Sequence, residues 1–318
     1  MDSDIAVNNI KRATPVKRKL GFYHYFKRDI YLYLLLLAPM AYFFIFRYGP
    51  MYGIIIAFKD YNIFQGVMKS EWIGLDAFKE VFAMSDFYKV LRNTVMLNFL
   101  DLVVGFPAPI ILAILLNEIR VTWFKKVSQT LLYLPHFLSW VIIGGISYQL
   151  LSPSGLVNGL LKSMGAVPIP FLTDKFVWVA TYVLIGVWQA VGWGTIIYLA
   201  AITGISAELY EAAEVDGAGR IRRIWHITLP CIKPTIIILL ILNLGRMVSI
   251  GFDRPFIIGN SLVSDYSEVI STLVYRVGLK SANFTLATAI GLFQSIVCLI
   301  FLLVTNYIAE KSGEQGIW

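Results

Sequence analysis

Long apolar stretches are the feature that most constrains how this chain can fold. A helix needs about 20 predominantly apolar residues to cross the hydrocarbon core of a bilayer. Six stretches meet this need, at residues 30–48, 93–117, 127–151, 176–204, 231–250 and 284–309. The composition agrees, because 58% of the residues are hydrophobic and 15% are charged, whereas soluble domains carry about 25% charged residues. We therefore predict an all-α fold, a polytopic membrane bundle with six transmembrane helices.

The distribution of Lys and Arg predicts which helix ends face the cytoplasm. If residues 1–29 lie inside, six crossings also put residues 118–126, 205–230 and 310–318 inside. These segments, counted with Lys233 at the membrane boundary, hold 15 of the 27 Lys and Arg residues. Excess positive charge marks the cytoplasmic side of a membrane protein. We therefore expect both termini in the cytoplasm, and the net charge of +7 does not indicate nucleic acid binding.

The sequence offers no pattern typical of a catalytic, metal or nucleotide site. Cys231 and Cys298 lie within apolar stretches and are expected to be small buried side chains. His24, His136 and His226 do not share the spacing of a metal site. A phosphate-binding G-x-x-x-x-G-K-[ST] loop is also absent. We therefore predict a protein that is not an enzyme, with no catalytic residue, metal or cofactor, and expect any nucleotide chemistry in another subunit.

One cytoplasmic segment, residues 205–230, is polar although it joins two apolar stretches. Its sequence from residue 209 is LYEAAEVDGAGRIRRIWHITLP. Ser206 is a good N-cap and residues 207–215 are strong helix formers, which predicts a short helix of about two turns. Gly217 is expected to end it. Two adjacent alanines in this helix would let another surface approach closely, which favours a docking site over a plain solvated loop.

Nine positions of this segment resemble the EAA loop in the permease subunits of bacterial binding-protein-dependent ABC importers. The matching residues are Glu211, Ala212, Ala213, Asp216, Gly217, Ala218, Ile227, Leu229 and Pro230. The resemblance implies the type I ABC importer permease fold. It also implies that the helix around Glu211 is a coupling helix, which docks in a cleft of a cytoplasmic ATPase subunit that binds the ATP.

Further matches resemble the branch of this family that imports complex oligosaccharides. They lie at residues 48–51, 72–78, 91–94 and 251–253, and the resemblance covers about residues 28–310. It implies an oligosaccharide substrate, an extracytoplasmic solute-binding protein, and a second permease subunit, with a heterodimer favoured and a homodimer still open. It also implies a location in the bacterial cell membrane, surrounded by lipid.

The longest predicted outer segment of the transmembrane domain (residues 30–309) is residues 49–92. It is too long for a tight turn and carries four aromatic side chains among mixed charges. They are Trp72, Phe78, Phe82 and Phe87. We predict that this segment is an outer platform for the binding protein. The alternative is that these rings only pack against the helices.

Two charged residues, Asp101 and Arg246, lie away from the outermost residues of their predicted transmembrane helices. A charge at mid-bilayer costs roughly 2.5–3.5 kcal/mol on insertion scales, so both are expected to face a cavity or each other. Counting about 1.5 Å per residue inward from Arg92 and from Lys233 places them at similar depths. They are therefore predicted to form an ion pair, unless Arg246 contacts the substrate instead.

Resemblance to the maltose-type permeases implies substrate contacts on the helices that flank the EAA loop. The matching positions are Gln189 and Trp193 before the loop, and Arg246 and Ser249 after it. A guanidinium binds carboxylates with two parallel hydrogen bonds, which suits an acidic oligosaccharide such as one derived from pectin or alginate. The face of the Trp193 ring would suit a sugar ring, although packing explains it equally well. Asp101 is the fifth candidate residue for substrate binding.

Two other classes of protein are alternatives to the oligosaccharide permease. The first is an ABC permease for a non-sugar solute such as a peptide, an amino acid or phosphate, which would share the EAA loop but not the sugar-branch matches. The second is a membrane enzyme or channel with an accidental EAA-like loop. It would need a catalytic cluster or a self-sufficient pore, which the sequence does not indicate.

Overall fold

The computed structural model describes residues 28–313 and residue 316, and the chain divides into two units between Gly53 and Ile54. Most of the predicted basic segment 1–29 therefore lies outside the described residues, as does part of the predicted tail 310–318. The first unit contains helix α2 (Ile30–Phe43), a π-helical turn η1 (Phe44–Tyr48) and α3 (Gly49–Met51). None of the residues of α2 is buried, as expected for a helix that presents apolar side chains to lipid.

Six helical segments of the described chain are long and apolar enough to cross a membrane, which confirms the predicted all-α bundle. They are Ile30–Phe58, Ser85–Glu118, Trp140–Ser163, Lys175–Thr203, Arg220–Leu244 and Phe284–Lys311. Four of them agree with the predicted spans apart from their ends. The third and the fifth differ in ways that bear on the site.

The predicted third span, residues 127–151, is not a continuous helix, and that prediction was wrong. Helix α8 (Thr122–Tyr133) is followed by a 3-10 turn η4 (Leu134–Phe137), and then by α9 (Trp140–Leu151) and α10 (Leu156–Ser163). Pro135 lies in η4 and has no N–H to donate to the preceding turn, and the extended backbone of Leu138 and Ser139 then separates η4 from α9. The new helix begins at Ser139, whose side chain caps it by accepting from the Ile142 N–H.

The fifth span ends earlier than predicted. It consists of α13 (Arg220–Arg223), a π-helical turn η5 (Ile224–Thr228) and α14 (Leu229–Leu244). Gly245 ends α14 and packs so closely on α18 that a Cβ there would lie 2.8 Å from a methyl carbon of Leu302. Residues 245–248 then form turns. Arg246 therefore lies in a turn after the helix, and its prediction as part of the fifth span was wrong.

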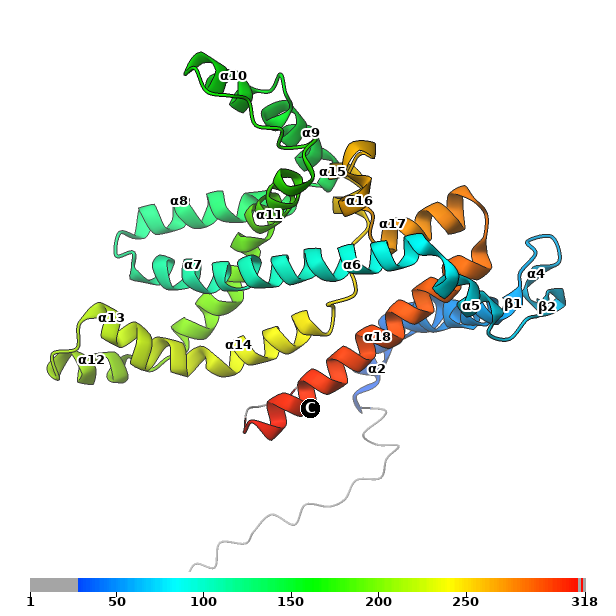
Figure 1. Cartoon of the computed structure of the whole chain (residues 1–318). Helices are drawn as coiled ribbons and strands as arrows, with labels where there is room; N and C mark the ends of the chain where they lie inside the picture. Colours follow the sequence, from blue (N-terminus) through cyan, green and yellow to red (C-terminus); the bar gives the residue numbers. More distant parts are fainter. Residues whose placement is uncertain (1–27, 314–315, 317–318) are drawn as a thin grey trace, which may run out of the picture. The chain divides into compact units, whose positions relative to one another are not determined.

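The second span is a single long element that contains a π-helical turn. Helices α6 (Ser85–Leu100) and α7 (Pro107–Glu118) continue in one line in Figure 1, joined by η3 (Asp101–Gly105). The turn η3 lies just before Pro107, as η1 lies before Pro50 and η5 before Pro230. A proline removes one i→i−4 hydrogen bond, and a wider turn accommodates the loss without breaking the helix.

The remaining elements connect these spans. They are η2 (Tyr52–Phe58), β1 (Lys59–Asp60), α4 (Gly66–Lys69), β2 (Glu71–Trp72), α5 (Asp76–Ala83), α12 (Ala207–Val215), α15 (Asp253–Ile258), η6 (Ser261–Val263), α16 (Ser264–Ser267), α17 (Ile270–Tyr275) and η7 (Arg276–Lys280). Strands β1 and β2 pair antiparallel, with Lys59 opposite Trp72. The other two long helices are α11 (Lys175–Thr203) and α18 (Phe284–Lys311).

Helix α11 is the centre of the second unit, since it packs against α7, η3, η4, α8 and α14. Small residues allow this close packing. A Cβ on Gly192 would overlap the backbone carbonyl of Leu132, and one on Gly194 would lie 2.9 Å from the Pro109 ring. One buried cluster surrounds Trp178 and Tyr182 of α11, and another surrounds its C-terminal Tyr198 and Ile202. The candidate site lies along the length of α11 between these clusters.

Candidate functional site

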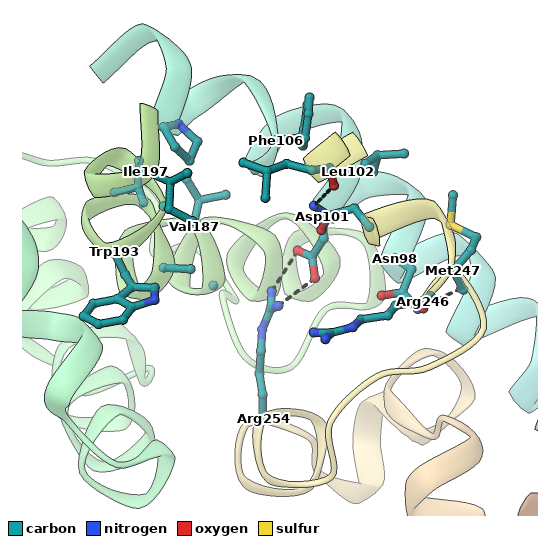
Figure 2. A pocket seen from close by; sticks show the side chains of 18 of the residues that line it. Asn98, Asp101, Leu102, Phe106, Val187, Trp193, Ile197, Arg246, Met247 and Arg254 are labelled. Carbon is teal, nitrogen blue, oxygen red and sulfur yellow. Dashed lines mark hydrogen bonds and ion pairs between the residues drawn. The ribbon is translucent and has the colours of Figure 1, made fainter. Parts of the chain in front are cut away.

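A cavity of about 510 Å³ is lined by α6, η3, α7, α11, α14 and the segment that follows α14, including α15. Most of its lining is apolar. The side chains that bring charge, hydrogen-bonding groups or an indole ring are Asn98, Asp101, Trp193, Tyr198, Asn243, Arg246, Ser249 and Arg254. Figure 2 shows these elements around the cavity, with Arg246 and Arg254 entering from the segment after α14. Four of the five predicted binding residues line the cavity, and Gln189 does not.

Asp101 pairs with Arg254, which corrects the prediction of an ion pair with Arg246. The Arg254 Nη1 and Nη2 atoms donate to the two Asp101 carboxylate oxygens at 2.7 Å and 3.1 Å. The pair is largely buried, with side-chain exposures of 13% for Arg254 and 27% for Asp101. Arg254 follows the predicted fifth span, so a comparison of depths within the predicted spans does not include it.

Arg254 reaches Asp101 because α15 returns into the helix bundle. This helix packs against α9, where a Cβ on Gly144 would overlap the Ile257 side chain. A Cβ on Gly186, in the middle of α11, would overlap the Arg254 guanidinium. The guanidinium also donates to the Tyr182 carbonyl at 2.6 Å and lies 3.7 Å from the centroid of the Tyr182 ring. The Arg254 guanidinium therefore packs closely between Gly186, Tyr182 and Asp101.

Arg246 has the opposite environment. It is exposed to the cavity, and its guanidinium forms no ion pair with any residue from 28 to 313. Its backbone is held in place, because the Asn98 side-chain amide donates to the Met247 carbonyl at 2.8 Å and approaches the Arg246 carbonyl at 3.5 Å. Asn98 therefore fixes the turn while the Arg246 side chain extends into the cavity (Figure 2).

Trp193 lines the cavity with its ring stacked on His136. The two ring centroids lie 4.6 Å apart with an interplanar angle of 7°. His136 belongs to η4, so the break at Pro135 is what brings this imidazole against α11. Gln189 lies on the same helix, where its side-chain amide is directed at the His136 carbonyl at 3.5 Å. Gln189 thus contacts η4 and not the cavity, while Trp193 is about half exposed at the cavity.

The EAA-like segment forms the predicted helix, α12 (Ala207–Val215), with Ser206 as its cap. Gly217 follows with a φ of +72°, and the Ala218 N–H donates to the Ala213 carbonyl at 2.8 Å. Only glycine adopts this left-handed conformation easily, which explains its position after the helix. Glu211 and Val215 are exposed, the latter at 90%. The segment therefore presents a stable, uncovered helix.

The Tyr210 hydroxyl and the Thr228 hydroxyl lie 3.0 Å apart, and the Arg223 Nη1 donates to Glu214 at 3.1 Å. These contacts join α12 to the start of the fifth span.

The predicted outer segment folds as a short hairpin followed by α5. Trp72 is 62% exposed, and it stacks on Phe58 with the ring centroids 5.9 Å apart. Phe87 is fully buried, and its ring centroid lies 5.3 Å from that of Phe293 in α18. Part of this aromatic set therefore packs on the helices. Phe64, at the hairpin tip, is 96% exposed.

A cluster of ion pairs joins α6, α11, α16 and η7. Asp265 accepts from Lys89 and from Lys175, each at 3.3 Å, and joins the starts of α6 and α11. Hydrogen bonds from Lys89 and Lys175, together with their charges, hold the pKa of Asp265 below its ordinary value. Arg276 pairs with Glu268 at 2.7 Å and with Asp86 at 3.2 Å.

The family model for the binding-protein-dependent transport system inner membrane component matches residues 88–312. This match covers the cavity, the α12 segment and five of the six spans. The chain belongs to this family. The permease therefore has the type I ABC importer fold, and its family is one of membrane transport components.

Relatives and solved structures of high similarity support the same assignment. The permease is 44% identical to Protein LplB of Bacillus subtilis (strain 168), over 97% of this chain and 98% of the relative. It is 46% identical to the polygalacturonan/rhamnogalacturonan transport system permease protein YteP of the same organism, over 91% and 90%. It also resembles a chain of a bacterial alginate ABC transporter, solved with a periplasmic protein bound to alginate pentasaccharide. That likeness has a TM-score of 0.84 and 39% identity, covering 93% of this chain and 99% of the other.

Sequence reasoning missed Arg254, Asn98 and Asn243. Two signals could have found them. Asn98 precedes Asp101 by three residues and Asn243 precedes Arg246 by three, a spacing that places side chains on one helix face. Arg254 lies in a short run between Gly251 and Gly259 that is otherwise largely apolar, a pattern that fits a buried helix better than a solvated loop.

Proposed function

We propose that this permease imports acidic oligosaccharides, such as those derived from pectin or alginate, as one subunit of an ABC importer. The observation that carries the proposal is the exposed guanidinium of Arg246 in a cavity between the spans, which forms no ion pair with the residues that the structure describes. A cation at membrane depth is costly unless it faces a water-filled cavity or a partner of opposite charge, so an open guanidinium in a transport path indicates an anionic ligand. Arg246 binds a carboxylate of the sugar, and Asp101 acts through its pair with Arg254.

The rest of the cavity suits a sugar. Asn98, Asn243 and Ser249 offer amide and hydroxyl groups for sugar hydroxyls, and Trp193 offers a flat apolar face held by His136. Relatives that transport polygalacturonan or rhamnogalacturonan and alginate support the same substrate class. These sugars carry carboxylates, whereas a neutral solute would leave Arg246 without a counterion.

Helix α12 couples transport to ATP hydrolysis in a separate ATPase subunit. Its exposed residues Glu211, Ala212, Asp216 and Gly217 form the docking surface, with Ala213 and Ala218 half-buried behind them. The contacts from Tyr210 and Glu214 to the fifth span pass the motion of the ATPase to the cavity wall. A second, non-identical permease subunit completes the pathway.

The membrane orientation follows from this coupling. The α12 side is cytoplasmic, together with both termini, and the hairpin of residues 59–72 is on the outer side of the bacterial cell membrane. That hairpin and α5 form the platform for the binding protein, with Trp72 and Phe64 as exposed anchors.

The substrate class is tested by uptake into proteoliposomes that contain the complete importer with its binding protein. Trigalacturonate and its methyl ester share one skeleton and differ in charge. We expect import of trigalacturonate by the wild type. Arg246→Gln should assemble normally and lose about tenfold or more of this uptake, because a hydrogen bond between charged groups contributes about 1.5–3 kcal/mol. Lys162→Gln, which removes a charge far from the cavity, is the matched control. Equal uptake by Arg246→Gln and wild type would contradict the proposal.

The coupling role is tested at Gly217, whose positive φ proline cannot adopt. Gly217→Pro or Glu211→Lys should leave the protein in the membrane and abolish both transport and ATPase association. Gly219→Ala is the matched control, since that residue has a φ of −67° and open space at its Cβ position. Normal transport by a well-expressed double variant of Glu211 and Gly217 would rule out the coupling role.

The platform is tested by cysteine crosslinking to the binding protein. Exposed Lys69→Cys or Lys79→Cys should crosslink, and fully buried Ala57→Cys should not. Failure at every exposed position of residues 59–83 would count against the platform.

A further inference from the structure

Asp101 is the only carboxylate among the described residues that line the cavity, and two guanidinium groups share this space with it. Both of its oxygens accept from Arg254. Figure 2 shows the Arg246 side chain directed toward the Arg254 guanidinium. The fixed charges of the cavity are thus one neutralised arginine and one arginine that is open to a ligand.

Arg254 does not depend on Asp101 alone for its position. It also donates to the Tyr182 carbonyl at 2.6 Å, and its guanidinium lies 3.7 Å from the Tyr182 ring centroid and 5.6 Å from that of Trp140. A cation against an aromatic face is stabilised even without a counterion. If Asp101 were uncharged, Arg254 would keep these contacts, and its remaining N–H groups would be available to the cavity.

We propose that Asp101 determines the charge selectivity of the cavity by occupying Arg254, so that Arg246 alone receives a substrate carboxylate. The inference rests on the proposed import of acidic oligosaccharides. A transport path must bind its substrate strongly enough to admit it and weakly enough to release it. Two open guanidinium groups would hold neighbouring carboxylates of one oligomer at the same time. Asp101 prevents this double attachment and keeps the substrate releasable.

This role predicts opposite effects on affinity and on turnover. Asp101→Asn should raise the affinity of the transporter for trigalacturonate by about tenfold, the effect of one added charged hydrogen bond, and should lower the maximal uptake rate. The affinity for the methyl ester should not change. Asp101→Asn combined with Arg246→Gln should recover binding that Arg246→Gln loses, because the freed Arg254 takes over the carboxylate. A purely structural role of Asp101 would lower uptake of both ligands alike and would not raise affinity.

The test is equilibrium binding of trigalacturonate and of its methyl ester to the complete transporter in detergent without its binding protein, with uptake measured in parallel. Asp265→Asn, which removes a paired carboxylate outside the cavity, is the control. Unchanged affinity in an assembled Asp101→Asn variant would overturn the inference while leaving the proposed function intact. Absence of trigalacturonate import by the wild type would overturn both.

If Asp101→Asn does not assemble, the uncharged pair Asp101→Asn with Arg254→Gln replaces it. The inference then predicts the wild-type affinity and the wild-type preference for the acid over the ester, since Arg246 still acts alone. Loss of that preference in the assembled double variant would overturn the inference.

Discussion

The two arginines that follow α14 have the same side chain and opposite environments. Arg254 is packed on Gly186 and Tyr182 and bound by Asp101 on both arms of its guanidinium. Arg246 lies in a turn whose backbone accepts a hydrogen bond from the Asn98 side-chain amide, and the Arg246 side chain is open to the cavity. The Arg254 cation, whose two terminal nitrogens donate to protein acceptors, holds structure together, whereas the open Arg246 cation is available to a ligand. Charge alone, as read from the sequence, does not separate the two.

The largest expected effect of breaking this contrast is at Arg254. Arg254→Gln leaves the Asp101 carboxylate largely buried without its partner, at a cost of about 3–5 kcal/mol for a broken buried pair. We expect a strong loss of assembled protein, measured as the amount of complete transporter after gel filtration. Asp101→Asn in the same chain should restore assembly, because neither charge is then left alone. Normal assembly of Arg254→Gln would show that the pair does not hold α15 in place.

A smaller effect is expected at Gly186. A methyl group there overlaps the Arg254 guanidinium and must displace it, and overpacking of this kind costs about 1–3 kcal/mol. Gly186→Ala should lower the thermal unfolding midpoint of the purified transporter. Gly145→Ala on α9 is the matched control, because the space around its Cβ position is open. Equal unfolding temperatures of the two variants would show that the packing between Gly186 and Arg254 is less tight than its geometry indicates.

The general architecture was accessible from the sequence because it depends on long runs of one chemical character. Counts of apolar residues located six spans, and helix formers between Ser206 and Gly217 gave α12 with its observed bounds. The break at Pro135 was missed, since Pro is tolerated inside other spans of this chain, as Pro39 is in α2. Proline alone does not say whether a membrane helix bends or stops.

The site was only partly accessible, because its partners come from chain segments that local patterns do not connect. Asp101 and Arg246 were identified by their charge within apolar stretches. Their relation was predicted wrongly because α15 returns between α9 and α11, and this return depends on the small residues Gly144 and Gly186 on two other helices. The stack of His136 on Trp193 likewise follows from the break at η4.

The smallest expected effect is at Asp265, whose ion pairs are exposed to solvent. Asp265→Asn should leave assembly and unfolding temperature nearly unchanged, because exposed pairs contribute little. Lys89 and Lys175 lower the folded-state pKa of this carboxyl, so its contribution is present above the unfolded pKa of aspartate, about 3.9. It is lost as the pH falls through the lowered folded-state pKa. Unfolding temperatures of wild type and variant at pH 7 and at acidic pH would check this. A loss of assembled protein as large as that of Arg254→Gln would show that the exposed Asp265 pairs matter as much as the largely buried pair.

The contrast between the two arginines can be measured most directly in the unmodified protein. Phenylglyoxal reacts with accessible guanidinium groups, and mass spectrometry of the digested transporter reports each arginine separately. We expect fast modification of Arg246, protection of Arg246 by trigalacturonate but not by its methyl ester, and slow modification of Arg254 in every condition. Equal reactivity of Arg246 and Arg254, or equal protection of Arg246 by the acid and the ester, would contradict it.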